Sequence, residues 1–247
     1  MSRVVFGVRP VVELCRARPR EVAVVYVADG YRSQEIDAAV ATAKDRGIAV
    51  EYRPRSLVAD LAASPNHQGI LAVAGEYHYA RTDEMLAAAA AASEPPLLLV
   101  LDCITDPQNF GALVRSAEVL GAHGVIVPDK HAAPVTGAVV KAAAGATERM
   151  RIARVGNLLG TLDGLRAQGL AVWGGTAADG ATPLAEADLR GPVAVVVGGE
   201  GRGLRMAVAR RCSALVRIPQ RGQVASLNAS VAGALLLYEA VRQRGGR

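Results

Sequence analysis

The amino-acid sequence predicts an α/β protein with a mostly parallel sheet and a second, smaller α/β domain. Short β-branched runs alternate with helical patterns along the whole chain, which is the order of elements in α/β folds. The run Val193–Val197 is continuously apolar, as expected of a parallel strand that is buried on both faces. The double proline Pro95-Pro96 divides the elements into two series and marks a boundary.

The first series, in residues 1–75, is short and predicts the smaller domain. Its expected elements are strand 22–27, helix 33–46, strand 48–52, helix 56–63 and strand 69–74. Gly47 would end the first helix, and Ser56 is a candidate N-cap of the second. Residues 76–94 are polar and then alanine-rich, so we expect a linker there that can contain a helix.

The second series, in residues 95–247, predicts the larger domain. The expected strands are 97–101, 124–127, 150–153, 170–173, 193–197 and 215–218, and the expected helices are 107–120, 135–144, 157–168, 204–211 and 226–242. The last helix is apolar nearly all round, which predicts that it is buried. The small residues Ala232-Gly233-Ala234 at its centre would allow close packing, including packing on a second subunit.

Composition narrows the class of protein. The 247 residues contain 28 Lys and Arg against 23 Asp and Glu, so a nucleic-acid partner is plausible. No acidic residue lies between Glu200 and Glu239, where six arginines do: Arg202, Arg205, Arg210, Arg211, Arg217 and Arg221. This cluster fits an RNA contact, and it fits a solvated helix face or a subunit contact equally well.

Several other classes are disfavoured. No apolar run reaches the roughly 18–20 residues that span a bilayer, and no secretion signal is visible, so we expect a cytoplasmic protein. The three cysteines are far apart and the four histidines are scattered, so we expect no disulfide framework and no metal site.

Three segments carry the chemistry, and the first follows strand 97–101. Asp106 is a good N-cap and Pro107 a good first helical residue. Gly111 and Arg115 share a helix face, so Arg115 should lie back toward Asn109 and the free amides of the helix start. The segment predicts an anion-binding corner, or else an ordinary capped helix with a surface arginine.

The second segment is the glycine-rich turn Gly198–Leu204, which follows the buried strand 193–197. Such a turn lets backbone approach a ligand closely, although it also suits a simple strand-to-helix connection. Its glycines do not have the Gly-x-Gly-x-x-Gly spacing of a dinucleotide-binding turn, and it lacks the Gly-Lys-Ser/Thr sequence of a phosphate-binding loop.

The third segment is the irregular stretch Ile218–Ser230, which precedes the last helix. Ser226, Asn228 and Ser230 crowd the helix start, where only one of them can cap it. The surplus polar side chains favour a ligand at this helix start.

In order, the three segments resemble the motifs of the SpoU/TrmH family of RNA 2′-O-ribose methyltransferases. Asn109, Gly111 and Arg115 match N-x-G-x-x-x-R, and Gly198 and Glu200 match the start of G-x-E-x-x-G. The third segment is similar to I-P…S-L-N-x-S, through Ile218, Pro219, Ser226, Leu227, Asn228 and Ser230. The segments 7–11 and 66–70 resemble the L30e-like substrate domain of this family. With this domain and the three motifs both present, the chain looks most like the 23S rRNA guanosine-2′-O-methyltransferase subgroup.

The resemblance implies a fold and a set of roles. It implies a trefoil-knotted C-terminal sheet, an unusual feature that elementary packing rules do not predict, and a homodimer. It implies that S-adenosylmethionine is held by backbone around five residues: Thr176, Gly198, Gly199, Ile218 and Leu227. It implies that five others are catalytic, in positioning the nucleoside and its phosphate: Asn109, Arg115, Glu200, Ser226 and Asn228.

Arg115 is assigned as the base in the family, but arginine stays protonated in proteins. We therefore expect Arg115 to clamp the adjacent phosphate and stabilise the developing alkoxide, while a phosphate oxygen or water takes the proton.

The expected activity is methylation of a ribose 2′-hydroxyl, with a guanosine of 23S rRNA as the first expectation. Methylation of tRNA or of another rRNA nucleotide, as in resistance enzymes, is the alternative within the enzymes. A catalytically silent RNA-binding protein on the same fold is the alternative outside them. A conventional Rossmann methyltransferase is disfavoured, because the first strand of the second series runs into Asp102–Asp106 rather than a glycine-rich turn.

Overall fold

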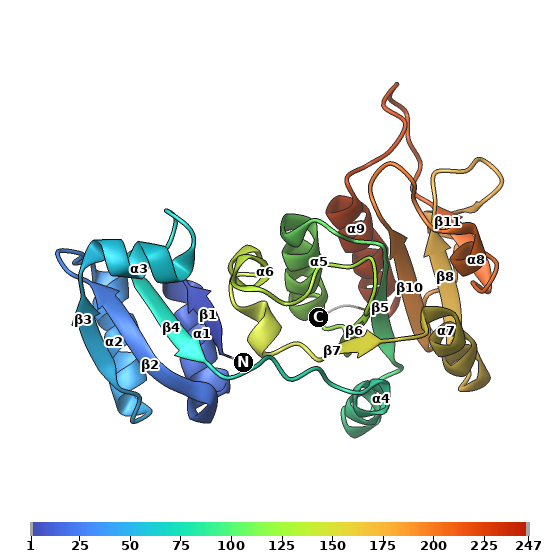
Figure 1. Ribbon diagram of the computed structural model, residues 1–247. Helices are drawn as coiled ribbons and strands as arrows, with labels where there is room; N and C mark the ends of the chain where they lie inside the picture. Colours follow the sequence, from blue (N-terminus) through green and yellow to red (C-terminus); the bar gives the residue numbers. More distant parts are fainter. Residues whose placement is uncertain (1, 246–247) are drawn as a thin grey trace. The chain divides into compact units, whose positions relative to one another are not determined.

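The computed structural model describes residues 2–245, which fall into two compact units (Figure 1). Unit 1 comprises Met1–His78 and Pro134–Arg149, and unit 2 comprises Tyr79–Ala133 and Met150–Arg247. The stretch 134–149 therefore folds with the first part of the chain, although it lies within the second series of elements.

Unit 1 is a four-stranded sheet covered by helices on both faces (Figure 1). The strands lie in the order β1 (Arg3–Phe6), β4 (Ile70–Ala74), β2 (Val22–Ala28) and β3 (Val50–Arg53). Only the pair β2–β3 is parallel. Helices α1 (Val8–Ala17) and α2 (Gln34–Asp45) pack together on one face, and α3 (Arg55–Ala62) covers the other.

The five elements expected in this part of the chain are present within about two residues of their expected ends. Ser33 caps α2 by accepting a hydrogen bond from the Ile36 amide at 3.2 Å. The expectation for Ser56 was wrong, because α3 begins at Arg55 and Pro54 is its N-cap residue. Strand β1 and helix α1 were not predicted; Pro10 obscures the helical pattern, although it lies in the first turn, where proline is tolerated.

The stretch 134–149 supplies α6 (Gly137–Ala142) and the short 3₁₀ helix Ala146–Glu148 to unit 1. The buried carboxylate of Glu148 accepts two hydrogen bonds from the Arg3 guanidinium, at 2.8 and 2.9 Å. A Cβ at Gly137 would lie 2.5 Å from the Val4 carbonyl oxygen, so glycine allows α6 to approach β1. Breaking such a buried, hydrogen-bonded ion pair is costly, which explains why this distant stretch stays with unit 1.

Unit 2 is built on a seven-stranded sheet in which every strand pair is parallel. The order is β7 (Ile152–Val155), β6 (Gly124–Pro128), β5 (Leu97–Asp102), β10 (Val193–Gly198), β8 (Ala171–Gly175), β11 (Ala214–Arg217) and β9 (Thr182–Pro183). The strand predicted at 193–197 lies at the centre and is buried on both faces, as its unbroken apolar pattern indicated. Strand β9 was not predicted, since two residues carry no periodicity.

Helices cover both faces of this sheet (Figure 1). Helices α4 (Thr82–Ala91), α7 (Leu158–Ala167) and α8 (Met206–Ala209) lie on one face, over a core that includes Leu98, Val100 and Val196. Helices α5 (Pro107–Val119) and α9 (Ala229–Gln243) pack together on the other. A Cβ at Gly233 of α9 would lie 2.3 Å from the Leu113 side chain, so this glycine lets α9 pack closely on α5.

The last helix is only partly buried in the single chain, and its packing on a second subunit stays a prediction. Val231, Leu235 and Tyr238 of α9 are 47%, 38% and 55% exposed. The sheet and α5 cover only part of the helix surface, so an apolar face is left over in the single chain. No helix in the described residues 2–245 is long and apolar enough to cross a membrane.

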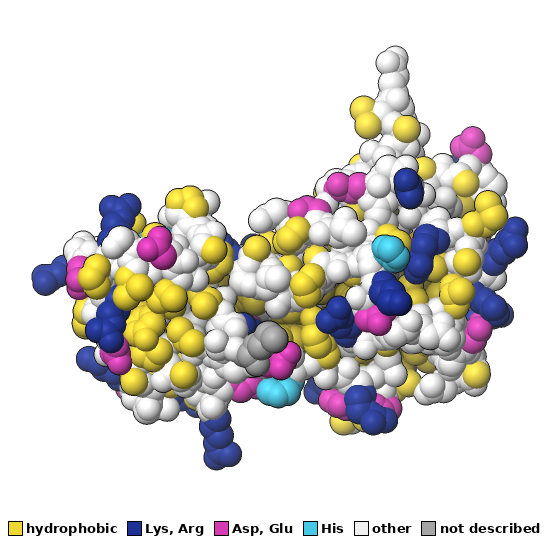
Figure 2. Space-filling view, viewed as in Figure 1, with side chains coloured by type: hydrophobic (Ala, Val, Ile, Leu, Met, Phe, Trp, Pro, Cys, Tyr) yellow, Lys and Arg dark blue, Asp and Glu magenta, His cyan; other side chains and the backbone are white. Residues whose placement is uncertain are grey.

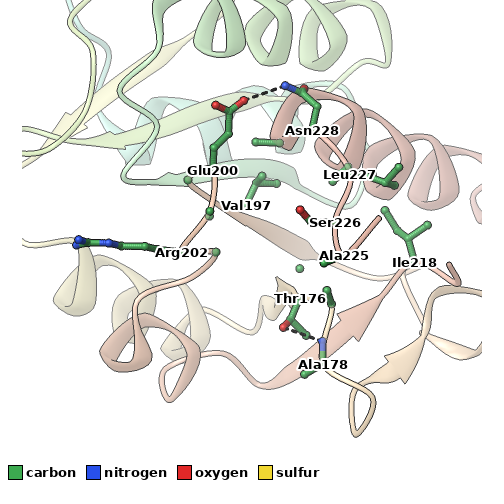
Figure 3. Close-up of a pocket in the computed structure, with 18 of the residues that line it drawn as sticks. Thr176, Ala178, Val197, Glu200, Arg202, Ile218, Ala225, Ser226, Leu227 and Asn228 are labelled. Carbon is green, nitrogen blue, oxygen red and sulfur yellow. Dashed lines mark hydrogen bonds between the residues drawn. The ribbon is translucent and has the colours of Figure 1, made fainter. Parts of the chain in front are cut away.

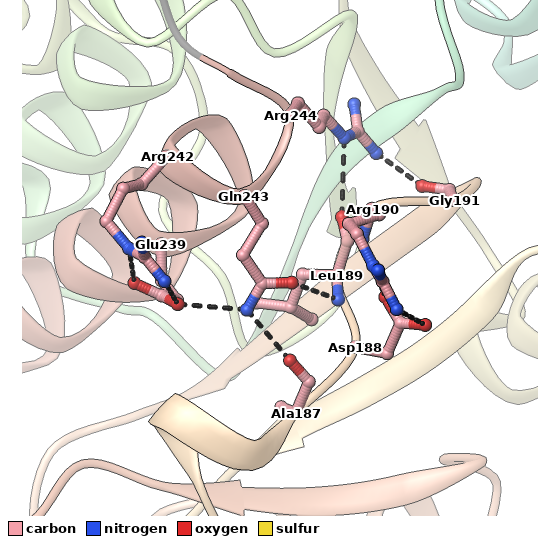
Figure 4. Close-up of polar contacts among 9 residues, drawn as sticks. All are labelled: Ala187, Asp188, Leu189, Arg190, Gly191, Glu239, Arg242, Gln243 and Arg244. Atoms are coloured by element: carbon pink, nitrogen blue, oxygen red, sulfur yellow. Dashed lines mark hydrogen bonds and ion pairs between the residues drawn. The ribbon is translucent and has the colours of Figure 1, made fainter.

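The end of α9 is tied to the edge of the sheet where β5 and β10 begin (Figure 4). The amide group of Gln243 donates to the Ala187 carbonyl and accepts from the Leu189 amide, both at 2.8 Å. Arg244 donates to the carbonyl oxygens of Pro95 and Pro96, at 2.8 and 3.0 Å. These bonds connect the end of α9 to backbone beside the starts of β5 and β10, and they hold the last helix against the sheet.

We expect this network to make stability depend on acid pH through Glu239. Hydrogen bonds from Arg242 and Gln243 lower the pKa of the Glu239 carboxyl to about 2. Because the folded pKa lies below the unfolded value, the stabilisation is complete above the unfolded pKa of 4.5 and is lost as pH falls toward 2. In Glu239→Gln, the urea midpoint of unfolding should therefore fall less steeply over this pH range than in wild type. An equally flattened profile in Glu186→Gln, which removes an exposed carboxylate, would contradict this assignment.

Candidate functional site

A cavity of about 560 Å³ lies at the carboxyl ends of β8, β10 and β11 in unit 2 (Figure 3). Three loops line it: the residues after β8, the glycine-rich turn after β10, and the stretch that leads from β11 into α9. The carboxyl ends of parallel strands are where open α/β sheets bind ligands. The volume is that of a site for a small organic molecule.

The glycine-rich turn has its shape because side chains do not fit there. A Cβ at Gly198 would lie 2.1 Å from the Gly203 carbonyl carbon, and a Cβ at Gly199 would lie 2.4 Å from the Cys103 carbonyl oxygen. The Gly203 amide donates to the Gly199 carbonyl at 2.9 Å and closes the turn, and Gly203 has a φ of 62°. The turn therefore presents bare backbone to the cavity.

A polar cluster joins the three predicted motifs at the rim of the cavity. The Asn228 side-chain amide donates to Asn109 Oδ1 and to Glu200 Oε1, both at 2.9 Å. Figure 3 shows the bond to Glu200. The Asn109 amide group also donates to Glu200 Oε1. Two amide groups thus hold one oxygen of the Glu200 carboxylate, and within residues 2–245 its other oxygen has no hydrogen-bond partner and can accept from a ligand.

Local structure orients each member of this cluster. Asp106 caps α5 through the amides of Gln108 and Asn109, as the sequence predicted. Asn228 is the residue that caps α9, since its Oδ1 accepts from the Ser230 amide at 2.9 Å and from the Val231 amide at 3.4 Å. Its amide nitrogen is therefore turned away from the helix and toward Glu200.

The structure brings most of the predicted site residues together. All five residues expected to contact the cofactor line the cavity: Thr176, Gly198, Gly199, Ile218 and Leu227. Of the residues expected to be catalytic, Glu200, Ser226 and Asn228 also line it, and Asn109 contacts two of them.

Arg115 is the exception. It is exposed, does not line the cavity, and makes no hydrogen bond or ion pair within the described part of the chain. Six residues separate it from Asn109, which is a rotation of about 240° around the helix. Arg115 was expected to lean back toward Asn109 because it shares a helix face with Gly111. Asn109 lies on a different side of the same helix, so the shared face does not bring Arg115 to it.

Sequence reasoning missed Asp102, which is fully buried at the end of β5. One oxygen of Asp102 accepts from the Arg205 backbone amide at 2.8 Å, and the other accepts from Arg205 Nε at 2.6 Å. Asp102 therefore anchors the far end of the glycine-rich turn. A carboxylate that ends an otherwise apolar strand, Leu97–Asp102, was the available signal.

Two of the six arginines predicted as a cluster between Glu200 and Glu239 are engaged in ion pairs. Arg205 pairs with Asp102, and Arg211 pairs with Asp163 at 3.0 Å. Arg202 lines the cavity, but its guanidinium points away from the residues around Ser226 (Figure 3). Figure 2 shows Lys and Arg side chains on the same face as Asp and Glu side chains.

Comparison with known proteins identifies the family. Residues 96–238 match the model of the SpoU rRNA methylase family, and residues 4–80 match a model described as RNA 2′-O ribose methyltransferase substrate binding. An uncharacterized tRNA/rRNA methyltransferase of Mycobacterium sp. (strain KMS) is 44% identical over 244 residues, which cover 98% of this chain and 77% of that protein. The putative TrmH family tRNA/rRNA methyltransferase YacO of Bacillus subtilis is 36% identical, over 97% of this chain and 95% of its own length.

A solved structure agrees with these relatives. The SpoU methyltransferase AviRb of Streptomyces viridochromogenes, in complex with the cofactor AdoMet, superposes with a TM-score of 0.79 and 28% identity. The match covers 98% of this chain and 90% of that one. With both family models matched in order and the three motifs assembled around one cavity, the chain belongs to the SpoU family of RNA methyltransferases.

Proposed function

We propose that the protein transfers a methyl group from S-adenosylmethionine to a ribose 2′-hydroxyl of RNA, in the first instance to a guanosine of 23S rRNA in the cytoplasm. The observation that carries the proposal is the Asn109–Glu200–Asn228 cluster at the rim of a backbone-lined cavity. We further propose that the C-terminal segment is knotted as in the family. We also propose that residues 1–75, 76–94 and 95–247 correspond to the substrate domain, linker and methyltransferase domain, with the stretch 134–149 of the last range packed on unit 1.

The cavity suits S-adenosylmethionine in size and chemistry. Its apolar walls include Val197, Ile218 and Leu236, which would cover the uncharged parts of the cofactor. Backbone at Gly198 and Leu227 would supply the donors and acceptors that fix its orientation. When bound, the cofactor supplies an electrophilic methyl group, so the protein itself has to present the nucleophile.

The polar cluster is placed to present a ribose. A neutral hydroxyl is a weak nucleophile and gains strength as it gives up its proton. The second oxygen of Glu200 can accept a hydrogen bond from the ribose, and Ser226 also lines the cavity. Holding the hydroxyl in line with the methyl group accounts for much of the rate gain that such a site provides.

Arg115 retains its proposed role as a phosphate clamp, but the single chain leaves it outside the cavity. The exposed face of α9, formed by Val231, Leu235 and Tyr238, supports a homodimer, because apolar helix faces of this kind are normally covered. In a dimer, or with a long RNA bound, Arg115 can contact a phosphate that its own cavity does not reach.

Labelled S-adenosylmethionine and RNA test the proposal directly. Purified protein should incorporate methyl groups into 23S rRNA, and mapping of 2′-O-methyl positions should find one ribose that is unmodified in cells lacking the gene. Arg115→Ala should reduce turnover far more than cofactor binding. Methylation of tRNA, or of a base instead of a ribose, would contradict the proposed substrate. RNA binding that does not depend on the cofactor, without methyl transfer, would indicate a catalytically silent RNA-binding protein.

Asp102→Ala should weaken cofactor binding without touching the cofactor. It releases the Arg205 end of the glycine-rich turn, so the turn has to be reordered whenever the cofactor binds. We expect the Kd for S-adenosylmethionine, measured by calorimetry, to rise about tenfold, in line with the loss of a hydrogen bond to a charged group. Asp163→Ala, which removes the exposed ion pair of Arg211, is the matched control and should leave the Kd unchanged. An unaltered Kd in folded Asp102→Ala would refute this role.

A further inference from the structure

Unit 1 contains a second cavity, of about 730 Å³, which the proposed chemistry does not use. Its walls come from the first turns of α1 and α2, from the loop that precedes β4, and from α6. Both helices therefore point their amino-terminal ends, which carry partial positive charge, toward this cavity.

The cavity walls carry more cations than acids. Arg9, Arg32 and Lys141 line the cavity, against the single carboxylate of Glu35. Arg9 and Arg32 are exposed and make no ion pair in the described residues, so both guanidinium groups are available to a ligand. Tyr31 also lines the cavity, and its ring is in contact with the Arg55 guanidinium, 5.1 Å from the ring centre. A groove with several unpaired cations is suited to the phosphate backbone of a nucleic acid.

Lys141 is the third cation of this cavity, and it lies on α6, far from the other two in the sequence. Its amine donates to the Asn66 carbonyl and lies 5.3 Å from the centre of the Phe6 ring. In the same loop, Gln68 accepts a hydrogen bond from the Val8 amide at 3.0 Å. The loop, α1 and α6 are thus held together as one binding surface rather than three separate segments.

Several of these contacts depend on glycines and on a buried histidine. The Gly69 amide donates to Nδ1 of the buried His67 at 3.1 Å, and Gly69 has a φ of 77°. A Cβ at Gly69 would lie 2.4 Å from the Tyr31 ring, so the glycine lets that ring lie against the loop. His67 therefore acts as a structural residue that shapes the cavity.

We propose that this cavity binds a backbone phosphate of the substrate RNA, at a nucleotide distant from the methylated one, through Arg9, Arg32 and Lys141. The inference rests on the proposed function for the identity of the polymer. The proposed site extends beyond residues 4–80, the segment that matches the substrate-binding model, because Lys141 belongs to the stretch 134–149. The exposed position of the two arginines favours a ligand that continues beyond the cavity.

The test measures binding of the full-length protein to a 23S rRNA transcript across a series of salt concentrations. Arg9→Ala, Arg32→Ala and Lys141→Met should each lower affinity by roughly tenfold at low salt. Each should also reduce the slope of log affinity against log salt by up to roughly 0.7–0.9, which is the contribution of the one phosphate that the three cations share. Lys141→Arg should restore both values. The Kd for S-adenosylmethionine and the rate at saturating RNA should stay at wild-type levels in all of these variants.

Matched controls lie on the same unit. Lys44→Met and Arg46→Ala remove exposed cations at the opposite end of α2, about 16 Å from its first turn, and should leave the salt slope unchanged. Lys141→Met keeps the aliphatic stem over Phe6; should it fail to fold, the two exposed arginines still decide the question.

Two results would overturn the site. One is a salt slope in the three variants equal to that of the controls. The other is displacement of the RNA by inorganic phosphate or guanosine monophosphate at micromolar concentration, which would indicate a small-molecule site. Failure of the proposed function is distinguishable, since the wild type would then bind the transcript with the expected slope and transfer no methyl group to it.

Discussion

Replacement of Asn228 with alanine should lower methyl transfer at saturating RNA and cofactor by about 10²-fold or more, the effect typical of removing a preorganised donor. The Asn228 amide donates to both Asn109 and Glu200, and without it the Glu200 carboxylate loses one of its two amide donors. The ribose would then meet a carboxylate that has to be oriented anew in each turnover. Single-turnover kinetics with labelled cofactor measures this step.

Asn228 also caps α9, so loss of activity through unfolding has to be separated from loss of the site. Alanine at an N-cap costs about 0.5–2 kcal/mol. Asn228→Asp keeps an oxygen for the Ser230 and Val231 amides but places a second carboxylate against Glu200. We expect Asn228→Asp to unfold near the wild-type midpoint and still lose most of its activity. Wild-type rates in Asn228→Asp would contradict the proposed role of the amide.

Gly198→Ala should abolish measurable cofactor binding, with the Kd for S-adenosylmethionine raised at least about 10²-fold. The added Cβ would lie 2.1 Å from the Gly203 carbonyl carbon and 2.3 Å from the Leu204 amide nitrogen. Both are backbone atoms and cannot rotate away as a side chain would, so the whole turn has to move into or away from the cavity. A change of this kind is expected to cost several kcal/mol of binding energy, where each 1.4 kcal/mol is about tenfold in Kd.

The control for Gly198→Ala is Gly222→Ala in the loop before α9. A Cβ at Gly222 would meet no atom within 4 Å, so that variant should bind the cofactor normally. Calorimetry gives both Kd values, and the urea midpoint shows whether unit 2 stays folded. Cofactor binding in Gly198→Ala equal to that in Gly222→Ala would mean that the turn does not form the site.

Much of the fold could be predicted because unit 2 follows simple local rules. The unbroken apolar runs at β5 and β10, and the cap Asp106 before Pro107, were sufficient to place a parallel sheet and the start of α5. Strand β1 and helix α1 were missed because four residues and a proline-containing first turn carry weak periodicity. The knot stays a prediction, since periodicity along a chain contains no information about threading.

The motifs were sufficient to predict which residue types gather at the site, and the structure decided which of them touch. Asn109, Glu200 and Asn228 lie far apart in the sequence, and they meet because three strand ends and a helix start converge. Arg115 was predicted to lie with them, but it lies outside the cavity. It shares a face of α5 with Gly111, whereas Asn109 lies on another side of that helix.

The family, the alternation of strands and helices, and the glycines that expose backbone at the cavity could all be predicted from the sequence, since they depend on residues that are neighbours along the chain. Three features became visible only in the folded chain: α9 keeps an exposed apolar face, Asp102 anchors the glycine-rich turn, and residues 134–149 fold with unit 1. Each of these depends on contacts between distant residues, whose strength comes from burial and hydrogen-bond geometry that no local pattern records.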